Sequence, residues 1–384
     1  MTLDLWSLVT VLWMKKQPKF WGREGTTKCQ ITLSSFSSLT IPHDIRNLPP
    51  MEKGNLPRVG VLGGGSWATA ITKMLSNNLA EVNWWMRNER AVKHFNKYGH
   101  NPNYIQSIEF DRDIVKVTTN MQEVIDNSDI VVIAIPSAFL DSTIKEMKPK
   151  GLEDKIIFSA IKGIIVEYDS IPARYLHKEL GTPYDKIGII AGPCHAEEVA
   201  KEQLSYLTLA CPNQVYAQQM ADVLGCRYIR TSISEDVFGT EISAVLKNVY
   251  ATASGICHGI GYGDNFQAVL ISNAIQEIKR FVDTVHDVDR DVNSSAYLGD
   301  LLVTAYSPYS RNRSFGTMVG KGYSVKMAML EMSMVAEGYY AAKGIFEMNK
   351  RFQVEMPIAE AVYRILYEKI SPIIEMRLLT DHLS

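Results

Sequence analysis

The sequence predicts an α/β domain with a doubly wound, mostly parallel sheet, followed by an all-helical domain. Up to about residue 232, short β-branched runs alternate with amphipathic helical segments, the order of strands joined by crossover helices. From about residue 233 the segments are long and helical, and no convincing strand recurs. We therefore expect the α/β domain over residues 51–232 and the helical domain over residues 233–384.

The predicted elements follow in chain order. Strands are expected at residues 58–63, 81–87, 115–119, 129–136, 155–163, 186–193, 205–211 and 227–231, and helices between them at 66–78, 88–97, 121–128 and 213–224. In the second domain, helices are expected at about 234–258, 264–286, 325–348 and 357–378.

The first 50 residues differ from the rest of the chain. Leu5–Met14 is apolar, but an acidic residue precedes it and two lysines follow it, which reverses the charge order of a secretory signal. Met51 begins a segment that reads as a new start, MEKGNLPRVGVLGGG. We expect residues 1–50 to be an N-terminal extension that lies outside the fold.

The composition indicates an ordinary globular protein. Hydrophobic residues make up 46% and charged residues 21% of the 384, and the formal net charge is −2. These values exclude disorder throughout and argue against a dedicated nucleic-acid binder. No apolar run approaches the roughly 18–20 residues that cross a bilayer, so no membrane insertion is expected. The cysteines are widely spaced and form no CxxC pair, which favours reduced thiols and a cytoplasmic location. They are Cys29, Cys194, Cys211, Cys226 and Cys257.

A glycine turn follows the first predicted strand. Residues 63–68, GGGSWA, fit the pattern G-x-G-x-x-A and open a predicted helix, which is the context of a dinucleotide-binding turn. Gly63 permits the tight turn, Gly65 lets the backbone approach a pyrophosphate, and Ala68 allows close packing of helix and strand. The helix N-terminus adds free N–H groups and a partial positive charge. The alternative is a glycine turn without a ligand.

Arg87 ends the second predicted strand, 24 positions after Gly63. An NAD-specific site usually carries an acidic residue near this position to bind the ribose diol. A cation there suits a 2′-phosphate and favours NADP, with NAD as the open alternative. The other interpretation of Arg87 is a solvated surface residue.

Lys247 lies in an apolar helical segment. Glu241 is the other charged residue within 237–256, and six positions separate the two, so they do not share a helical face. The helical neighbours of Lys247 are small or polar, as in the wall of a cleft: Thr240, Ser243, Ala244, Tyr250, Ala251 and Ser254. Burial would lower the pKa of this lysine and suit it for proton transfer. The alternative is a lysine that extends to the surface.

Two further groups of polar residues are candidates for substrate binding or catalysis. Asp300 and Thr304 are four apart and would share a helical face, and the stretch 310–313, SRNR, places arginine beside hydroxyl and amide donors, as in a phosphate site. Their alternatives are helix capping and solvated charge. Cys194 has no base adjacent in sequence, and His195 has no metal-ligand partner nearby, so neither is assigned a role from spacing. No metal site is predicted, because the acidic run 287–291 lacks the glycine and closing glutamate of a calcium loop.

Seven segments, GGGSWATA, SAIKG, AGPCHAEEV, LKNVYA, GDLLVT, SRNRSFG and VAEG, occur in this order across residues 63–338. Together they resemble the NAD(P)-dependent glycerol-3-phosphate dehydrogenase family of bacterial type. The resemblance implies an N-terminal Rossmann-type domain, a helical C-terminal domain and a site in the cleft between them. It implies the reversible reduction of a phosphorylated triose, dihydroxyacetone phosphate, to sn-glycerol 3-phosphate with NAD(P)H, which supplies glycerophospholipid synthesis. A homodimer is one option for the oligomeric state.

The resemblance also implies roles for individual residues. Lys247 matches the proton donor and acceptor, Lys162 a lysine touching both cofactor and substrate, and Asp300 and Thr304 the polar partners of the reacting centre. The remaining substrate contacts match Gly192, Cys194, Ser310, Arg311 and Asn312. The remaining cofactor contacts match Gly63, Gly65, Ser66, Trp67, Arg87, Tyr104, Ala196, Arg311, Val335 and Glu337. Cys194 departs from the family's usual serine or threonine, and a thiol is a weaker hydrogen-bond donor.

Two rivals remain. A ketopantoate-type or other hydroxy-acid dehydrogenase would share this architecture without needing the phosphate site at 310–312. A nicotinamide-sensing regulatory protein would bind the cofactor without turnover and would have no reason to carry Lys162, Lys247 and Asp300.

Overall fold

The computed structural model of the chain describes residues 56–332 and 335–384. The chain divides into two units, Met1–Glu52 and Lys53–Ser384, and all described residues belong to the second. The predicted N-terminal extension, residues 1–50, lies outside the described residues.

An eight-stranded sheet forms the first half of this unit, in the order β3-β2-β1-β4-β5-β6-β7-β8. Neighbouring strands are parallel except β6 and β7, which pair antiparallel with Ile190 opposite Leu209. The chain runs outward from β1 to β3 and then returns to β4 on the other side of β1. This reversal is the switch point at which a doubly wound sheet binds a ligand. The strands are Val59–Leu62 (β1), Val82–Trp85 (β2), Val115–Thr118 (β3), Ile130–Ile133 (β4), Ile156–Ser159 (β5), Ile187–Ala191 (β6), Ser205–Ala210 (β7) and Ile229–Ser234 (β8).

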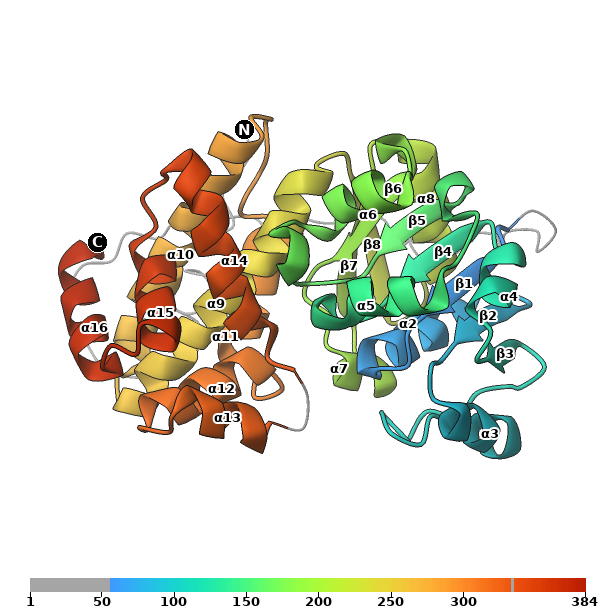
Figure 1. Ribbon diagram of the computed structural model, residues 1–384, viewed down its shortest axis with the longest axis horizontal. Helices are drawn as coiled ribbons and strands as arrows, with labels where there is room; N and C mark the ends of the chain where they lie inside the picture. Colours follow the sequence, from blue (N-terminus) through green and yellow to red (C-terminus); the bar gives the residue numbers. More distant parts are fainter. Residues whose placement is uncertain (1–55, 333–334) are drawn as a thin grey trace, which may run out of the picture. The chain divides into compact units, whose positions relative to one another are not determined.

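Helices cover both faces of the sheet (Figure 1). Successive residues of β4 pack into different clusters: Ile130 and Val132 lie with α2, α3 and α8, whereas Val131 and Ile133 lie with α4, α5 and α6. Burial on both faces explains why the central strands β1 and β4 are continuous apolar runs, whereas the edge strands β3 and β8 contain exposed polar residues. These helices are Ser66–Ser76 (α2), Glu89–Tyr98 (α3), Met121–Asp126 (α4), Ser137–Met147 (α5), Pro172–Leu180 (α6), Ala196–Ala200 (α7) and Gln214–Leu224 (α8).

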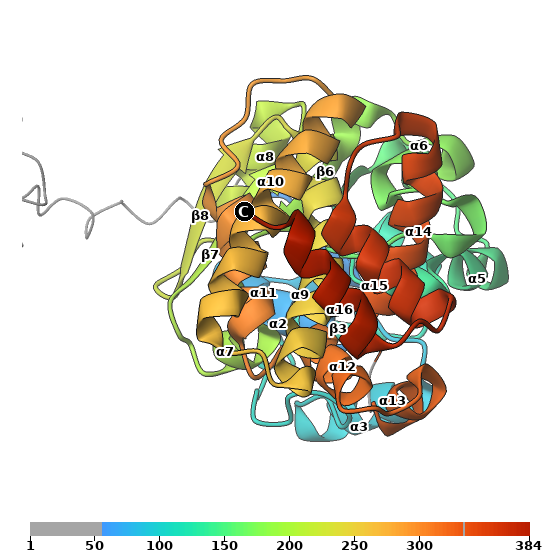
Figure 2. The same ribbon diagram turned by 90° about the vertical axis from the view of Figure 1, so that its left-hand side faces the viewer.

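The second half is helical and is organised around α9, Val237–Ile260. This helix lies in the middle of the others in both views and is buried along almost its entire length (Figures 1 and 2). The other helices are Asp264–Val285 (α10), Asp300–Tyr306 (α11), Arg311–Gly320 (α12), Val325–Glu331 (α13), Glu337–Phe352 (α14), Pro357–Tyr367 (α15) and Pro372–Leu379 (α16), with a π-helical turn at Ser295–Gly299 before α11.

Glycines allow α12 to approach α9 closely. A Cβ atom on Gly316 would lie 2.1 Å from the carbonyl oxygen of Thr252, and one on Gly255 would lie 2.1 Å from that of Arg313. Neither position tolerates a side chain, so the two backbones are in direct contact. This contact fixes the start of α12, which faces the cleft described below.

The predicted mixture of an α/β half and a helical half is confirmed, with differences in detail. The helix expected at 325–348 is wrong as one element, since α13 ends at Glu331 and α14 begins at Glu337. The helix expected at 357–378 also divides, because Pro372 cannot continue a helix and instead opens α16. Helices α5, α6, α7 and α12 were not predicted. Among the described residues, no helix has the length and apolar character needed to span a membrane.

Candidate active site

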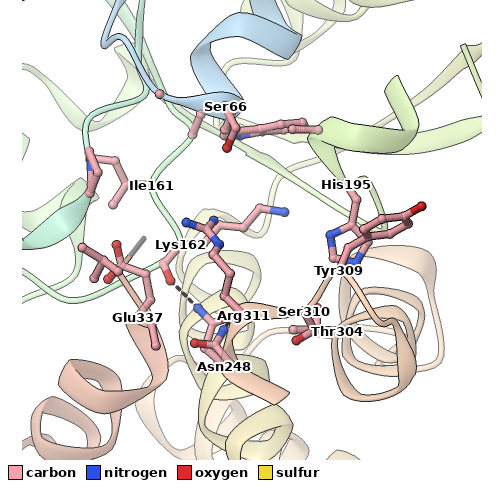
Figure 3. Close-up of a pocket in the computed structure, with 18 of the residues that line it drawn as sticks. Ser66, Ile161, Lys162, His195, Asn248, Thr304, Tyr309, Ser310, Arg311 and Glu337 are labelled. Carbon is pink, nitrogen blue, oxygen red and sulfur yellow. Dashed lines mark hydrogen bonds between the residues drawn. The ribbon is translucent and has the colours of Figure 1, made fainter. Parts of the chain in front are cut away.

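A cleft of about 520 Å³ lies between the carboxyl ends of the sheet strands and the helical half (Figure 3). The sheet half contributes the turn into α2 and the loops after β4, β5 and β6. The helical half contributes α9, α11, the start of α12 and the start of α14. The predicted site residues in its wall are Gly65, Ser66, Trp67, Tyr104, Lys162, Cys194, Ala196, Lys247, Asp300, Thr304, Ser310, Arg311, Asn312, Val335 and Glu337. Gly63, Arg87 and Gly192 do not line it.

The glycine turn has the geometry of an anion-binding helix start. Gly63 has a φ of +138°, and a Cβ there would lie 2.5 Å from the carbonyl oxygen of Ala134, so the position requires glycine. Gly65 is the N-cap of α2 without a side-chain cap, and a Cβ there would meet nothing within 4 Å. The first N–H groups of α2 therefore open onto free space, where a pyrophosphate fits. The indole Nε1 of Trp67 is buried without a hydrogen-bond partner in the protein, so it is a donor that a ligand in the cleft could use.

The other two predicted residues outside the cleft wall have different surroundings. Gly192 has a φ of +114°, and its carbonyl oxygen accepts a 3.5 Å hydrogen bond from Nζ of Lys162, so it supports the cleft from behind. Arg87 is exposed just beyond the end of β2. The preference between NADP and NAD thus stays a prediction.

A buried carboxylate joins two lysines at the centre of the cleft. Asp300, at the start of α11, accepts a hydrogen bond from Lys247 and lies 3.6 Å from Nζ of Lys162. The Lys247 side chain is only 4% exposed and that of Asp300 2%, so the alternative of a surface lysine at 247 is wrong. Thr304 donates a 2.6 Å hydrogen bond to the backbone oxygen of Asp300. Lys162 and Asp300 thus join Lys247 in one cluster, although they lie 85 and 53 positions away from it along the chain.

This environment shifts both ionisable partners. Burial lowers the pKa of Lys247, the charge of Lys162 lowers it further, and the carboxylate of Asp300 offsets only part of the effect. Burial alone would raise the pKa of Asp300, but the two ammonium groups outweigh it and hold the pKa below its usual value. Asp300 therefore stays ionised at neutral pH, and Lys247 is a lysine that releases its proton more easily than usual.

A chain of amide hydrogen bonds supports the cleft from the helical side. The side chain of Asn248 donates to the backbone oxygen of Lys162 at 2.5 Å and accepts from Asn312 at 2.8 Å (Figure 3). Asn312 accepts in turn from the N–H of Gly338 at 2.9 Å. These bonds connect the loop after β5 with α9, α12 and α14. Sequence reasoning missed Asn248, although it directly follows Lys247.

The start of α12 has the features of a phosphate site. Ser310 is the N-cap, and its Oγ accepts from the N–H of Arg313 at 3.3 Å. Ser310 and Asn312 are buried, whereas Arg311 is exposed between them and lines the cleft. The start of a helix and a residue that carries a guanidinium group therefore line the same cleft, which suits a dianionic ligand.

Glu337 holds the two halves of the unit together at the opposite wall. This buried carboxylate accepts from Oγ of Ser137 at 2.5 Å and from its N–H at 3.3 Å. Burial raises the pKa of Glu337, and the bonds from Ser137 limit the rise. Its bonds thus join the start of α14 to the start of α5.

The structure adds cleft residues that the sequence did not indicate, among them Phe139, His195, Tyr309 and Tyr340. His195 carried no signal because its neighbours in space come from other segments of the chain. Burial raises the pKa of the adjacent Cys194 thiol to about 12, so this group stays protonated and unreactive.

A glycine turn at the switch point of a Rossmann-type sheet, facing a buried lysine on the helical half, is the arrangement of a nicotinamide-dependent dehydrogenase. The family models agree. Residues 58–217 match the NAD-dependent glycerol-3-phosphate dehydrogenase N-terminus, and residues 236–376 match the C-terminus of the same family. The chain belongs to the NAD-dependent glycerol-3-phosphate dehydrogenase family.

Individual proteins support this assignment. The chain is 35% identical over 315 residues to glycerol-3-phosphate dehydrogenase (NAD(P)+) 2 of Salinibacter ruber, covering 82% of this chain and 91% of that protein. The crystal structure of the Coxiella burnetii glycerol-3-phosphate dehydrogenase superposes with a TM-score of 0.78 at 27% identity, over 85% of this chain and 99% of that one. A ketopantoate reductase of Ralstonia eutropha, from the rival class, reaches a TM-score of 0.53 at 14% identity, over 83% of this chain and 99% of that one, and shares the fold alone.

Proposed function

We propose that this chain interconverts dihydroxyacetone phosphate and sn-glycerol 3-phosphate with NAD(P)H, and that Lys247 is its proton donor and acceptor. One observation carries the proposal: a buried lysine paired with a carboxylate lies in the same cleft as the Ser310–Asn312 segment and a glycine turn that opens a helix. Family membership supplies the reaction. The geometry supports the proposed assignment of each task to a residue.

The residues present fit a nicotinamide dinucleotide. The open position at Gly65 and the N–H groups of Ser66 and Trp67 would hold its pyrophosphate. When bound, the reduced cofactor supplies a hydride to the carbonyl carbon of the substrate. Lys162, whose Nζ lies 5.3 Å from the centre of the Trp67 ring, belongs to both the cofactor side and the substrate side of the cleft.

We assign to Lys247 the stabilisation of the negative charge that develops on the substrate during reduction. Negative charge develops on the substrate oxygen, and an ammonium group beside it both stabilises that charge and delivers a proton. The lowered pKa of Lys247 makes this transfer easier in the forward direction and lets the neutral amine accept the proton in reverse. Asp300 orients Nζ of Lys247 through their hydrogen bond, and Thr304 is bonded to the Asp300 backbone.

Arg311, Ser310 and Asn312 would bind the phosphate. Anchoring this remote group holds the carbonyl near the hydride donor, which contributes to the rate by orientation rather than by chemistry. The phosphate site also separates this function from that of a ketopantoate-type reductase, whose substrate carries no phosphate.

An absorbance assay at 340 nm tests the proposal. The purified chain is mixed with NADH or NADPH and either dihydroxyacetone phosphate, dihydroxyacetone or ketopantoate. We expect oxidation of the cofactor only with the phosphorylated ketone. Turnover of ketopantoate, or cofactor binding without turnover of any of the three, would overturn the assignment.

Three broader expectations belong to the same proposal. We place the dinucleotide-binding domain at residues 51–232 and the substrate domain at 233–384; the last strand, β8, runs two residues past this boundary to Ser234, and α9 begins at Val237. The product would supply glycerophospholipid synthesis in the cytoplasm, and the free thiols of the four described cysteines are consistent with that compartment. A homodimer is the proposed oligomeric state, to be measured by light scattering.

A further inference from the structure

We propose that His195 determines specificity: its Nε2 accepts a hydrogen bond from the terminal hydroxyl of the triose phosphate. This inference rests on the proposed function. Arg311 and its neighbours account for the phosphate, and Lys247 accounts for the carbonyl oxygen. The hydroxymethyl group is the remaining polar part of the substrate, and it too needs a partner once the cleft excludes water.

His195 is well placed for this contact. It ends the loop after β6, immediately before α7, and its side chain lines the cleft together with Lys247, Asp300 and Tyr309. In Figure 3, His195 and Tyr309 lie together on one side of the pocket, and Glu337 lies on the other. The two rings meet edge to face, with centroids 6.2 Å apart and planes inclined at 62°.

One nitrogen of the ring has no partner in the protein. Nε2 of His195 is buried and makes no hydrogen bond, whereas the ring interacts with the backbone of Val303. Since Nε2 has no partner, we assign the interaction with Val303 to Nδ1 and place the proton of the neutral ring there. In this tautomer Nε2 is a pure acceptor. An unpaired acceptor in a cleft wall is suited to a ligand that donates.

The charge state of the ring selects among possible donors. Burial lowers the pKa of His195 to about 4, and the neighbouring ammonium groups of Lys247 and Lys162 add to the effect. A neutral acceptor has no proton at Nε2 to donate to a phosphate oxygen, so His195 is unsuited to the phosphate. A hydroxyl group can donate to it.

The other unpaired atoms of the cleft do not offer the same contact. Among the described residues that line it, three side chains have a buried polar atom without a hydrogen bond: Trp67, His195 and Asp300. Nε1 of Trp67 can only donate. Oδ2 of Asp300 already faces the ammonium group of Lys162 at 3.6 Å. His195 is thus the neutral acceptor that remains available.

Two substitutions of His195 distinguish the role of Nε2 from that of Nδ1. In His195→Asn, the side-chain amide can replace Nδ1 but is too short to reach the position of Nε2. In His195→Gln, the longer side chain can place an oxygen near Nε2. Each variant is assayed with dihydroxyacetone phosphate and with hydroxyacetone phosphate, in which a methyl group replaces the hydroxymethyl group. A matched control is His177→Asn, because His177 also contacts a backbone carbonyl through Nδ1 and packs on a tyrosine, Tyr184, outside the cleft.

We expect the wild-type chain to prefer dihydroxyacetone phosphate, since a site that bonds a hydroxyl rejects the analogue lacking it. His195→Asn should lower kcat/KM for dihydroxyacetone phosphate by about 10-fold or more, which corresponds to about 1.4 kcal/mol, and change it less than about 3-fold for the analogue. His195→Gln should retain most of the preference. His177→Asn should change neither value.

Equal losses with both ketones would assign His195 a structural or general positioning role and overturn the inference, as would an unchanged preference in His195→Asn. A wild-type chain that reduces both ketones equally well would refute the inference alone. A wild-type chain that reduces neither would refute the proposed function. Fluorescence titration with NADH verifies in each variant that the cofactor site is intact.

Discussion

Replacement of Lys247 by methionine is the sharpest test of the proposed chemistry. Methionine keeps the length and much of the volume of the side chain but removes the ammonium group. The carboxylate of Asp300 loses its direct partner and retains Lys162 at 3.6 Å, so the cluster is not left without a cation. We therefore expect Lys247→Met to fold and to bind cofactor, because Lys247 lies on α9, across the cleft from the glycine turn.

The expected loss follows from the two tasks assigned to this group. A positioned general acid contributes about 10²–10⁴-fold, and one charge-stabilising donor about 10²–10³-fold. One ammonium group performs both tasks here, so the factors overlap, and kcat should fall by at least about 10³-fold. The pH dependence of the two reaction directions provides a second test. Reduction needs protonated Lys247 and should decline as the pH rises through its lowered pKa, whereas oxidation of glycerol 3-phosphate needs the neutral amine and should rise over the same range.

The assay is cofactor absorbance at 340 nm in both directions, with NADH affinity measured separately by fluorescence. Lys155→Met is a suitable control, because Nζ of Lys155 donates to the backbone oxygen of Ser128 at 2.7 Å outside the cleft. A Lys247→Met variant that keeps kcat within 10-fold of wild type would refute the assignment of the proton to Lys247. Loss of NADH binding along with turnover would show that the residue supports the fold instead.

Three further predictions concern substrate binding and stability. Arg311→Ala should raise KM for dihydroxyacetone phosphate with a much smaller change in KM for NADH, and an unchanged KM for the ketone would contradict the phosphate role. Gly316→Ala should destabilise the chain by about 1–3 kcal/mol, because its Cβ would lie 2.1 Å from the Thr252 carbonyl oxygen; Gly263→Ala, where a Cβ meets nothing within 4 Å, is the control, and thermal unfolding measures the difference. Glu277 is buried, and burial raises its pKa from 4.5 to about 7, although the carboxylate accepts hydrogen bonds from two N–H groups of α15. Its contribution to stability is therefore full below pH 4.5 and is lost as the pH rises through 7. Glu277→Gln should therefore flatten the decline of the urea midpoint between about pH 5 and 8, and an unaltered slope would argue against this titration.

Local sequence was enough to predict the sheet half and the cofactor turn. A dinucleotide turn is made by consecutive residues, so the glycines at 63 and 65, between an apolar run and a helical pattern, carry the whole signal. The stretch 310–313 was singled out as a phosphate site, a role that stays a prediction, and the helix that begins there was missed. Its glycines weaken helical propensity, and close packing against α9 compensates for that weakness.

The sequence by itself determined the glycine turn, the order of the strands along the chain, and the kinds of side chain available for chemistry. Only the tertiary structure decided which of these side chains meet. The helical pattern around Lys247 fitted both a cleft and a surface, and the choice depended on Asp300 and Lys162, which the fold brings to it from distant segments. For the same reason, His195 was assigned no role from the sequence and Asn248 was missed. The pKa and the hydrogen-bond partners of a side chain depend on its neighbours in space, and those neighbours are set by packing rather than by position along the chain.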